Sequence, residues 1–500
     1  METENGAADE ASQLGQELLP LKCKKENFSS ASTGNLDSLV GIEEALEYSG
    51  FSFRHVLILS AVGLVLLSLF AQIEMIGLLA TELLCEFNLS PVQEAFLTSA
   101  FFTGMIFGAL LWGHLSDKYG RKRVIQLCSL FASITVLASS VTQSFTDTYL
   151  LRILVGMSMG GFHVCYTYAT EIVGSTHRAK ACLILFIFQY LGAVYGAAIG
   201  LITVTENNLG WRYYVLKSSL PIVLGLVSVT SICPESPRFL LVKGETDKAT
   251  KVVKILSSKP NSDLKLASIM KSIGDIGSWK DLIATPSDKM LLGVLSSLIF
   301  LIRFFNIGVA LLFYENLQNP YASDCNVLVE TYKESGGCDR LKKNDYSLDI
   351  LFSSSGIFGA LFYYFLADYF GRRKAMARSL SFSTLCMSTF YFCMPNYSRT
   401  ICSLVVKSFC FTTELVFNLY INEVYPTYSR SAASGFTDCF SRLGLALSPL
   451  ISQYLAKESY PSSVSVYIAS GVLGVVIIRS LKTETRAQLQ DDVWKKAEKK

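Results

Sequence analysis

Residues 113–122 read Gly-His-Leu-Ser-Asp-Lys-Tyr-Gly-Arg-Lys, a short charged turn between two long apolar stretches. A weaker copy of the turn, with the same Asp, Gly and Arg, lies at 368–374, half a chain length further on. A charged turn that recurs at half-chain spacing between apolar segments is typical of a duplicated membrane protein. We therefore predict two related halves, each built from membrane-spanning helices.

The composition agrees with a membrane protein. Hydrophobic residues make up 51% of the 500 residues and charged residues only 17%, whereas about a quarter of a soluble domain is charged. A run of about 20 apolar residues is long enough to cross a bilayer as a helix. The fold class we expect is an all-α membrane protein with twelve transmembrane helices in two pseudo-symmetric six-helix halves. The predicted spans are 56–80, 93–115, 124–143, 148–170, 181–204, 212–233, 290–314, 348–367, 375–395, 399–421, 431–456 and 461–480.

Polar stretches divide the chain into segments, and the positions of Lys and Arg orient them. Lys and Arg concentrate in the turns on the side shared by both termini, so the positive-inside rule places both termini in the cytoplasm. A polar loop at 315–347 is expected on the opposite, non-cytoplasmic side. The predicted segments are a cytoplasmic N-terminal tail at 1–52, a six-helix half at 53–233, a cytoplasmic linker at 234–289, a second six-helix half at 290–481 and a cytoplasmic tail at 482–500.

The repeat extends beyond the opening turn. A further Glu and Arg follow the fourth predicted helix of each half at nearly the same spacing. Two matches in the same order favour two halves related by a pseudo-twofold axis along the membrane normal. The matched positions are Asp117, Gly120, Arg121, Glu171 and Arg178 in the first half, and Asp368, Gly371, Arg372, Glu423 and Arg430 in the second.

Several stretches resemble a known family. The turn at 113–122 looks like the signature of the major facilitator superfamily, and the segments at 234–238 (Pro-Glu-Ser-Pro-Arg) and 422–430 (Asn-Glu-Val-Tyr-Pro-Thr-Tyr-Ser-Arg) resemble its sugar and organic-ion transporter branches. Gly-Trp-Arg-Tyr-Tyr at 210–214 and the two cysteines of the long polar loop look most like synaptic vesicle 2-related proteins. The resemblance covers about residues 41–486 and implies the major facilitator fold.

Two positions depart from the family pattern. Members of that branch commonly carry two acidic residues in the first span, whereas only Glu74 is present here. The second copy of the signature has Tyr364 where the first has Gly113. We therefore do not expect the two turns to act as equivalent gates.

The signature turns are the predicted gate. Gly120 allows the tight reversal between two spans, and Asp117, Arg121 and Lys122 place charges at the cytoplasmic face. In the superfamily the equivalent carboxylate faces a helix end, where the helix dipole stabilises it. Such a contact can act as a latch for alternating access, and the alternative is a static anchor that fixes topology. Two further pairs are expected at the same gate, Glu171 with Arg178 and Glu423 with Arg430.

Polar residues inside the predicted helices are the candidate contacts for a solute. An ionisable group in hydrocarbon costs a few kcal/mol, so such groups usually face a cavity or a partner. The resemblance implies a central cavity lined by spans one, four, seven and ten, and span five adds weaker candidates. The predicted substrate or ion contacts are Glu74, Gln189, Tyr190, Arg303, Asn306 and Glu414. Asp438 and Arg442, four residues apart on one helix, are expected to form an intramembrane pair.

Most of the thirteen cysteines lie inside predicted helices, where they act as small apolar residues. Cys325 and Cys338 lie instead in the polar loop on the non-cytoplasmic side, where disulfides form, and we predict a bridge between them. Cys85 lies on the same side and could compete for either partner.

These features predict a transmembrane transporter of a small organic solute, either an organic ion or a sugar-like molecule, with or without a coupled proton or other ion. The alternative is a vesicle membrane protein that does not transport and acts as a binding scaffold or receptor. The sequence has no nucleophile–base pattern, phosphate loop or metal-spaced ligand cluster, so we expect no enzyme, cofactor or metal. The lipid bilayer is the other expected partner and nucleic acid is not. We expect a monomer in an intracellular vesicle membrane or the plasma membrane.

Overall fold

The computed structural model describes residues 42–206, 210–257, 286–318, 343–391, 396–425 and 430–481. The chain divides into the segment Met1–Leu39 and a compact unit Val40–Lys500, and every described residue belongs to the second unit. The described residues form helices joined by turns, with no strand among them.

The first half contains six helical segments that match the first six predicted spans. Each is long enough to cross a bilayer, and three of them change helix type or direction along their length. They are α3 (Phe53–Phe87), α4 (Pro91–Tyr119), α5 (Arg121–Ser139), α6 (Phe145–Met159) continued by η1 (Gly160–His163) and α7 (Val164–Glu171), α8 (Arg178–Gly200) preceded by η2 (Ser175–His177) and continued by η3 (Leu201–Glu206), and α9 (Gly210–Ser218) with α10 (Leu220–Ile232).

The second half repeats this order. In both halves the fifth helix ends in a six-residue π-helical turn, η3 in the first and η7 in the second. The segments are α13 (Pro286–Gln318), α15 (Lys343–Phe370), α16 (Arg372–Ser388) continued by η6 (Thr389–Tyr391), α17 (Asn396–Val424), α18 (Arg430–Pro449) continued by η7 (Leu450–Leu455) and α19 (Ala456–Glu458), and α20 (Tyr460–Ser480).

Nine helical segments in the described part of the chain are long and apolar enough to cross a membrane. The three other predicted spans correspond to α15, α16 and α18. Of these, α16 is only 17 residues long, whereas α15 and α18 carry polar residues within their length. Polar residues in a spanning helix are tolerated where they face other helices, and in α15 and α18 polar residues such as Asp349, Ser353 and Arg442 are buried.

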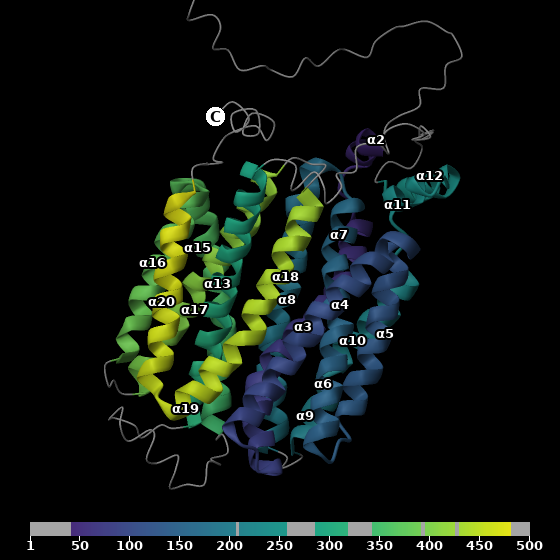
Figure 1. The fold of residues 1–500 in the computed structure, drawn as a ribbon. Helices are drawn as coiled ribbons and strands as arrows, with labels where there is room; N and C mark the ends of the chain where they lie inside the picture. The colour runs from purple at the N-terminus through teal and green to yellow at the C-terminus, as the bar shows by residue number, and fades with distance from the viewer. Residues whose placement is uncertain are drawn as a thin grey trace, which may run out of the picture. The chain divides into compact units, whose positions relative to one another are not determined.

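Three short helices lie at one end of the bundle (Figure 1). They are α2 (Ile42–Ser49), α11 (Pro237–Val242) and α12 (Thr246–Leu256). The end of α12 is fixed to the start of α3, because Ser52 Oγ donates to the Leu256 carbonyl at 2.9 Å and Arg54 Nη1 donates to the Ile255 carbonyl at 2.7 Å. We call this end, which also carries Gly120 and Gly371, the signature end, and the other end the opposite end.

The two halves share a core at the opposite end but not at the signature end. The buried apolar core of the first half continues into the second half through Leu311, Phe313, Tyr314, Tyr346 and Phe352, which lie toward the opposite end of α13 and α15. At the signature end of the second half, a separate core is built mainly from α13, α16, α17 and α20, with Ala433 of α18. Across the interface α4 lies against α18, and α8 lies against α15.

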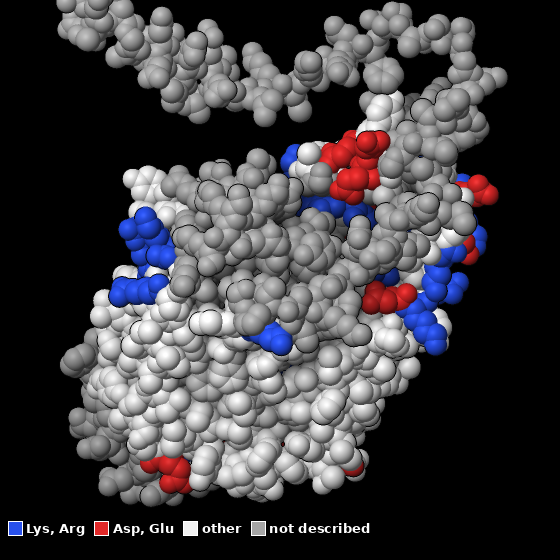
Figure 2. All heavy atoms as spheres, turned by 45° about the horizontal axis from the view of Figure 1, so that its top comes forward, with Lys and Arg blue, Asp and Glu red and all other residues white. Residues whose placement is uncertain are grey.

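The charged side chains on the surface lie at the two ends of the helical bundle. Figure 2 turns the signature end toward the viewer, and the blue basic side chains gather around that end, together with red acidic side chains. The broad flank below is almost uncoloured, with acidic side chains only at its lower margin. An uncharged belt between charged ends is the surface that a bilayer requires.

Cys325 and Cys338, the predicted disulfide pair, lie outside the described residues. Cys85, near the end of α3, is disulfide-bonded. The other eight cysteines of the described segments are free thiols, so none of them is its partner. The partner of Cys85 lies outside the described residues.

Candidate functional site

Gly120 forms the tight turn between α4 and α5. It is the C-cap of α4 and the N-cap of α5, with φ of 104°, a conformation that residues with a side chain rarely adopt. A Cβ at this position would collide with the Glu235 carboxylate and the Phe239 ring. Glycine is therefore required both by the backbone and by the segment that packs on it.

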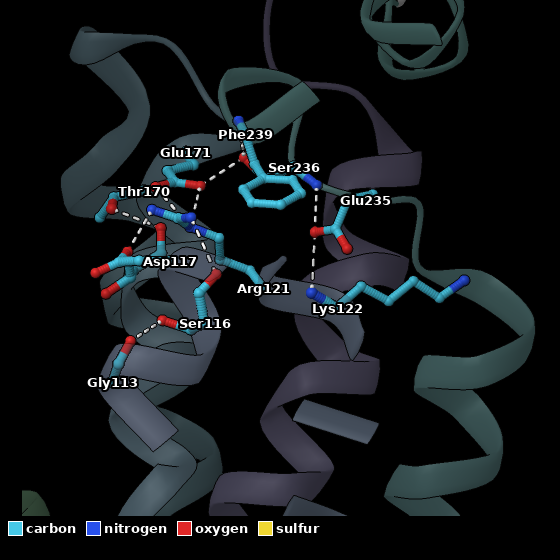
Figure 3. Close-up of polar contacts among 11 residues, drawn as sticks. Gly113, Ser116, Asp117, Arg121, Lys122, Thr170, Glu171, Glu235, Ser236 and Phe239 are labelled. Atoms are coloured by element: carbon cyan, nitrogen blue, oxygen red, sulfur yellow. Dashed lines mark hydrogen bonds and ion pairs between the residues drawn. The ribbon is translucent and has the colours of Figure 1, made fainter. Parts of the chain in front are cut away.

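Arg121, the first residue of α5, is the centre of a polar network at the signature end (Figure 3). Its Nε donates to Glu171 Oε1 at 3.1 Å, and its Nη1 donates to the Ser116 carbonyl at 3.2 Å. Its Nη2 also pairs with Asp117 Oδ1 at 3.2 Å. The Asp117 side chain is 76% exposed and the Glu171 side chain only 14%, so Glu171 is the stronger partner.

The segment after the sixth span closes over this network. Ser236 Oγ donates to Glu171 Oε2, and the Lys122 amide donates to Glu235 Oε1 at 3.0 Å. Figure 3 shows Glu171 between Arg121 and Ser236, with the Phe239 ring beside the guanidinium. The signature turn thus holds α4, α5, α7 and the start of the linker together within the first half.

The second turn repeats the central contact. Gly371 begins α16 with φ of 83°, and Arg372 Nη2 pairs with Glu423 Oε1 at 2.9 Å. The side chains of Asp368 and Arg430, two other predicted gate residues, lie outside the described part of the structure. Both turns therefore join an Arg after the glycine to a Glu at the end of the fourth span.

The structure does not form the predicted pair of Glu171 with Arg178. Arg178 Nη2 instead pairs with Glu43 Oε1 of α2 at 2.7 Å, and Glu43 Oε2 also accepts from Arg238 of α11. The turn between α7 and α8 points Glu171 toward α5 and Arg178 toward α2. Burial lowers the pKa of the Arg238 guanidinium, and the Glu43 carboxylate acts in the opposite direction.

Glu74 is the centre of a buried cluster between the halves. Lys407 Nζ of α17 lies 3.4 Å from its carboxylate, and Ser353 Oγ of α15 donates to it. Tyr314 OH lies 3.2 Å from Glu74 Oε1 and 2.9 Å from Asp349 Oδ1. Because Gly77 has no side chain, the Tyr314 ring fits against α3.

Asp349 was not among the residues predicted from sequence, although it is fully buried beside Glu74. An aspartate within the apolar run of α15 is the signal that could have identified it. A phenol has one hydrogen and can donate to one carboxylate at a time. The Tyr314 hydroxyl therefore donates to Glu74 or to Asp349 but not to both at once, and Lys407 is the cation beside Glu74.

Arg303, Asn306 and Glu414 form a second buried cluster inside the second half. Arg303 Nη2 pairs with Glu414 Oε1 at 2.9 Å, and Asn306 Nδ2 donates to Glu414 Oε2 at 3.0 Å. Arg303 Nε is buried without a hydrogen-bond partner. Glu74 and Glu414, predicted as one set, thus lie in two clusters with different partners.

Aromatic residues of the first half face this second cluster. Tyr166 and Tyr190 lie within electrostatic range of Arg303 and Glu414. The Tyr166 hydroxyl is buried and has no hydrogen-bond partner, and the Tyr190 ring packs edge-on against Phe411 at 4.8 Å between centroids. Tyr166 was not predicted, because a tyrosine in an apolar helix carries no distinctive signal. Gln189, which was predicted, is buried on α8.

Asp438 and Arg442 lie in contact, with Arg442 Nη2 2.8 Å from Asp438 Oδ2. Arg442 Nη1 also donates to the Met105 carbonyl of α4 at 3.0 Å. The charges of Asp438 and Arg442 compensate each other. Through Arg442 the pair also links the two halves midway along the bundle.

The structure has two repeated halves of membrane-spanning helices, with matched charged turns and with buried charges between the halves. These features define a multi-pass membrane protein of the transporter class. The chain belongs to the sugar (and other) transporter family, whose model matches residues 22–317, and the major facilitator superfamily model matches residues 344–499. The predicted family and twelve-helix fold are confirmed.

Individual relatives agree with this assignment. The synaptic vesicle 2-related protein of Bos taurus is 28% identical over 460 residues, covering 90% of this chain and 82% of the relative. A crystal structure of a D-xylose-proton symporter matches the fold with a TM-score of 0.65 and 17% identity, over 87% of this chain and 99% of that chain. A partially occluded inward-open conformation of the xylose transporter XylE from E. coli matches with a TM-score of 0.63 and 17% identity, over 88% and 100% of the two chains.

Proposed function

We propose that this protein moves a small organic solute across a membrane by alternating access. The supporting observation is the contrast between the two ends of the interface. At the signature end, the ion pairs formed by the two signature turns, Arg121 with Glu171 and Arg372 with Glu423, each join groups of the same half. Contacts between the halves occur midway and at the opposite end, where Lys457 of α19 pairs with Glu94 of α4.

This contrast corresponds to a conformation closed at the opposite end. The signature end is the proposed cytoplasmic end, because it gathers the basic side chains (Figure 2). Rocking the halves about the central contacts would close the signature end and open the other. The two signature networks keep each half rigid during such a motion, because they join helices within one half.

The proposed solute site lies between Arg303, Asn306 and Glu414 of the second half and Tyr166 and Tyr190 of the first. The pair of Arg303 and Glu414 offers one cation and one anion, and the unpartnered Tyr166 hydroxyl and Arg303 Nε offer hydrogen bonds. Such a site suits a polar organic ion or zwitterion, or a hydroxyl-rich sugar-like molecule. We propose solute transport and no catalysis for this site.

We further propose that a proton accompanies the solute through Glu74 and Asp349. The two carboxylates share Tyr314 OH, and Lys407 is the one lysine near them among the described residues, so binding and release of one proton changes their charge. The structural relative that is a D-xylose-proton symporter is compatible with this coupling. The name of the synaptic vesicle 2-related relative supports a vesicle membrane as the location.

Flux measurements test this function directly. The full chain in proteoliposomes would be supplied with labelled organic cations, organic anions and hexoses in turn. We expect saturable uptake of at least one of them, and Glu414→Gln should lower it about tenfold or more, because Arg303 loses its buried partner. Glu458→Gln, at an exposed position, is the matched control.

Glu74→Gln should abolish uptake driven by a pH gradient and leave solute exchange.

Binding of a solute without flux in the wild-type protein would instead indicate the scaffold or receptor. Intact pH-driven uptake in Glu74→Gln would contradict proton coupling and leave the transport proposal standing.

A further inference from the structure

A third buried charge cluster lies at the opposite end, apart from both clusters described above. It joins the start of α4 to the end of α13 and to α19. Glu94 lies in the first turn of α4, Glu315 lies near the end of α13, and Lys457 is the middle residue of α19. Their side chains are 0%, 9% and 5% exposed, respectively. Charged groups are almost never buried to this extent without a specific partner.

The geometry places one ammonium group between two carboxylates. Lys457 Nζ donates to Glu94 Oε2 across the interface between the halves, and it lies 3.8 Å from Glu315 Oε1 of its own half. Glu94 Oε1 is buried and has no hydrogen-bond partner. The neighbouring Glu458 is exposed, and Tyr314 is directed toward Glu74 and Asp349. Ion pairs at this point thus join Lys457 to Glu94 and to Glu315.

The charges of these three residues do not balance. If both carboxylates were ionised, the described groups would carry one surplus negative charge in a nearly dry interface. An uncompensated buried charge costs several kcal/mol, whereas a bound proton removes it. The unpartnered Glu94 oxygen shows that the lysine alone does not satisfy the site.

We propose that Glu94, Glu315 and Lys457 form a proton-binding site that holds one proton while the halves are closed at the opposite end and releases it when they separate. Separation moves Glu94 away from Lys457, which stays with Glu315 in the second half. Water then reaches both carboxylates and stabilises their ionised forms, so the proton passes to the compartment at that end. The release step rests on the proposed alternating access, whereas binding of the proton does not.

The direction of the pH effect follows from proton linkage. The closed state binds one more proton than the open state, so a lower pH favours closure. A difference of one proton changes the ratio of closed to open molecules by at most about tenfold per pH unit. Acid on the opposite side should therefore hold this end shut.

Infrared difference spectroscopy tests the bound proton without a substrate. The full chain would be studied in vesicles of ether-linked phosphatidylcholine, whose lipids lack ester carbonyls that would mask the signal. We expect a carboxylic acid C=O band at neutral pH that is weaker in Glu94→Gln and in Glu315→Gln and unchanged in Glu458→Gln. Lys457→Met should strengthen the band, because both carboxylates then need a proton. An unchanged band in the two glutamine variants would overturn the proposal.

A distance measurement tests the link to closure. Spin labels at the exposed positions Val92 and Ser462 would report the separation of the halves at the opposite end. In the wild type we expect the closed population to rise as the pH falls, by up to about tenfold per unit, and in Glu315→Gln to be nearly constant. The same pH dependence in both proteins would refute the coupling. Neither measurement depends on solute flux. A failure of the transport proposal can therefore be distinguished from a failure of the proton-binding site.

Discussion

At the scale of single residues, the two carboxylates that contact Arg121 differ in importance. Both Asp117 and Glu171 are paired with the same guanidinium, but only Asp117 is mostly exposed. An exposed ion pair contributes about 0–1 kcal/mol because water screens it. A charged hydrogen bond in a protected site contributes about 1.5–3 kcal/mol. Glu171 therefore carries more of the signature network than Asp117, the residue that the sequence motif emphasises.

Glu171→Gln should lower the apparent melting temperature of the purified protein by several degrees, and Asp117→Asn by about one degree at most. The glutamine leaves Arg121 without its protected partner and weakens the bond from Ser236, whereas the exposed Asp117 is readily replaced by water. Both changes keep the size of the side chain, so each serves as a control for the other. A larger effect of Asp117→Asn would show that the latch depends on a conformation other than this one.

At the scale of helices, α2 is held to the bundle by charge as well as by apolar contacts. Ala45 and Leu46 are buried, and Glu43 on the same short helix pairs with Arg178 of α8 and Arg238 of α11. One carboxylate therefore joins three elements that are far apart in sequence. An eight-residue helix is too short to be stable alone, so its order depends on these contacts.

We predict that Glu43→Gln increases hydrogen–deuterium exchange of residues 42–49 about tenfold or more, with little change in the spanning helices. The amide cannot pair with two guanidinium groups, so α2 loses its anchor while the bundle keeps its core. Glu44→Gln is the matched control, because Glu44 is the next residue and is exposed. Equal exchange in the two variants would mean that the apolar residues and the bonds from Thr176 to Glu47 hold α2 without Glu43.

At the scale of the whole molecule, the sequence predicted the helices, the family and the pair of Asp438 with Arg442 on one helix, but not which buried charges meet across helices. Each long apolar run identifies one membrane span, and the repeated turn shows that the two halves are related. Both features can therefore be recognised from the amino-acid sequence alone. Glu94 and Lys457 are more than 360 residues apart and meet only because α4 and α19 pack together. Glu43 was likewise assigned to a tail, since nothing local indicates that it reaches Arg178. Partners across helices require the tertiary arrangement.

The orientation of the molecule gives the last prediction. Basic side chains gather at the signature end, and moving them across a bilayer is unfavourable, so this end should face the cytoplasm. A cysteine at Lys251 on α12 and one at Ser462 on α20, both exposed, mark the two ends. In sealed cytoplasmic-side-out vesicles, a membrane-impermeant maleimide should label Lys251→Cys at once and Ser462→Cys only after the membrane is opened. The unmodified chain gives the background from its native thiols. Immediate labelling of Ser462→Cys with protection of Lys251→Cys would reverse the orientation, and with it the compartment that receives the proton from Glu94 and Glu315.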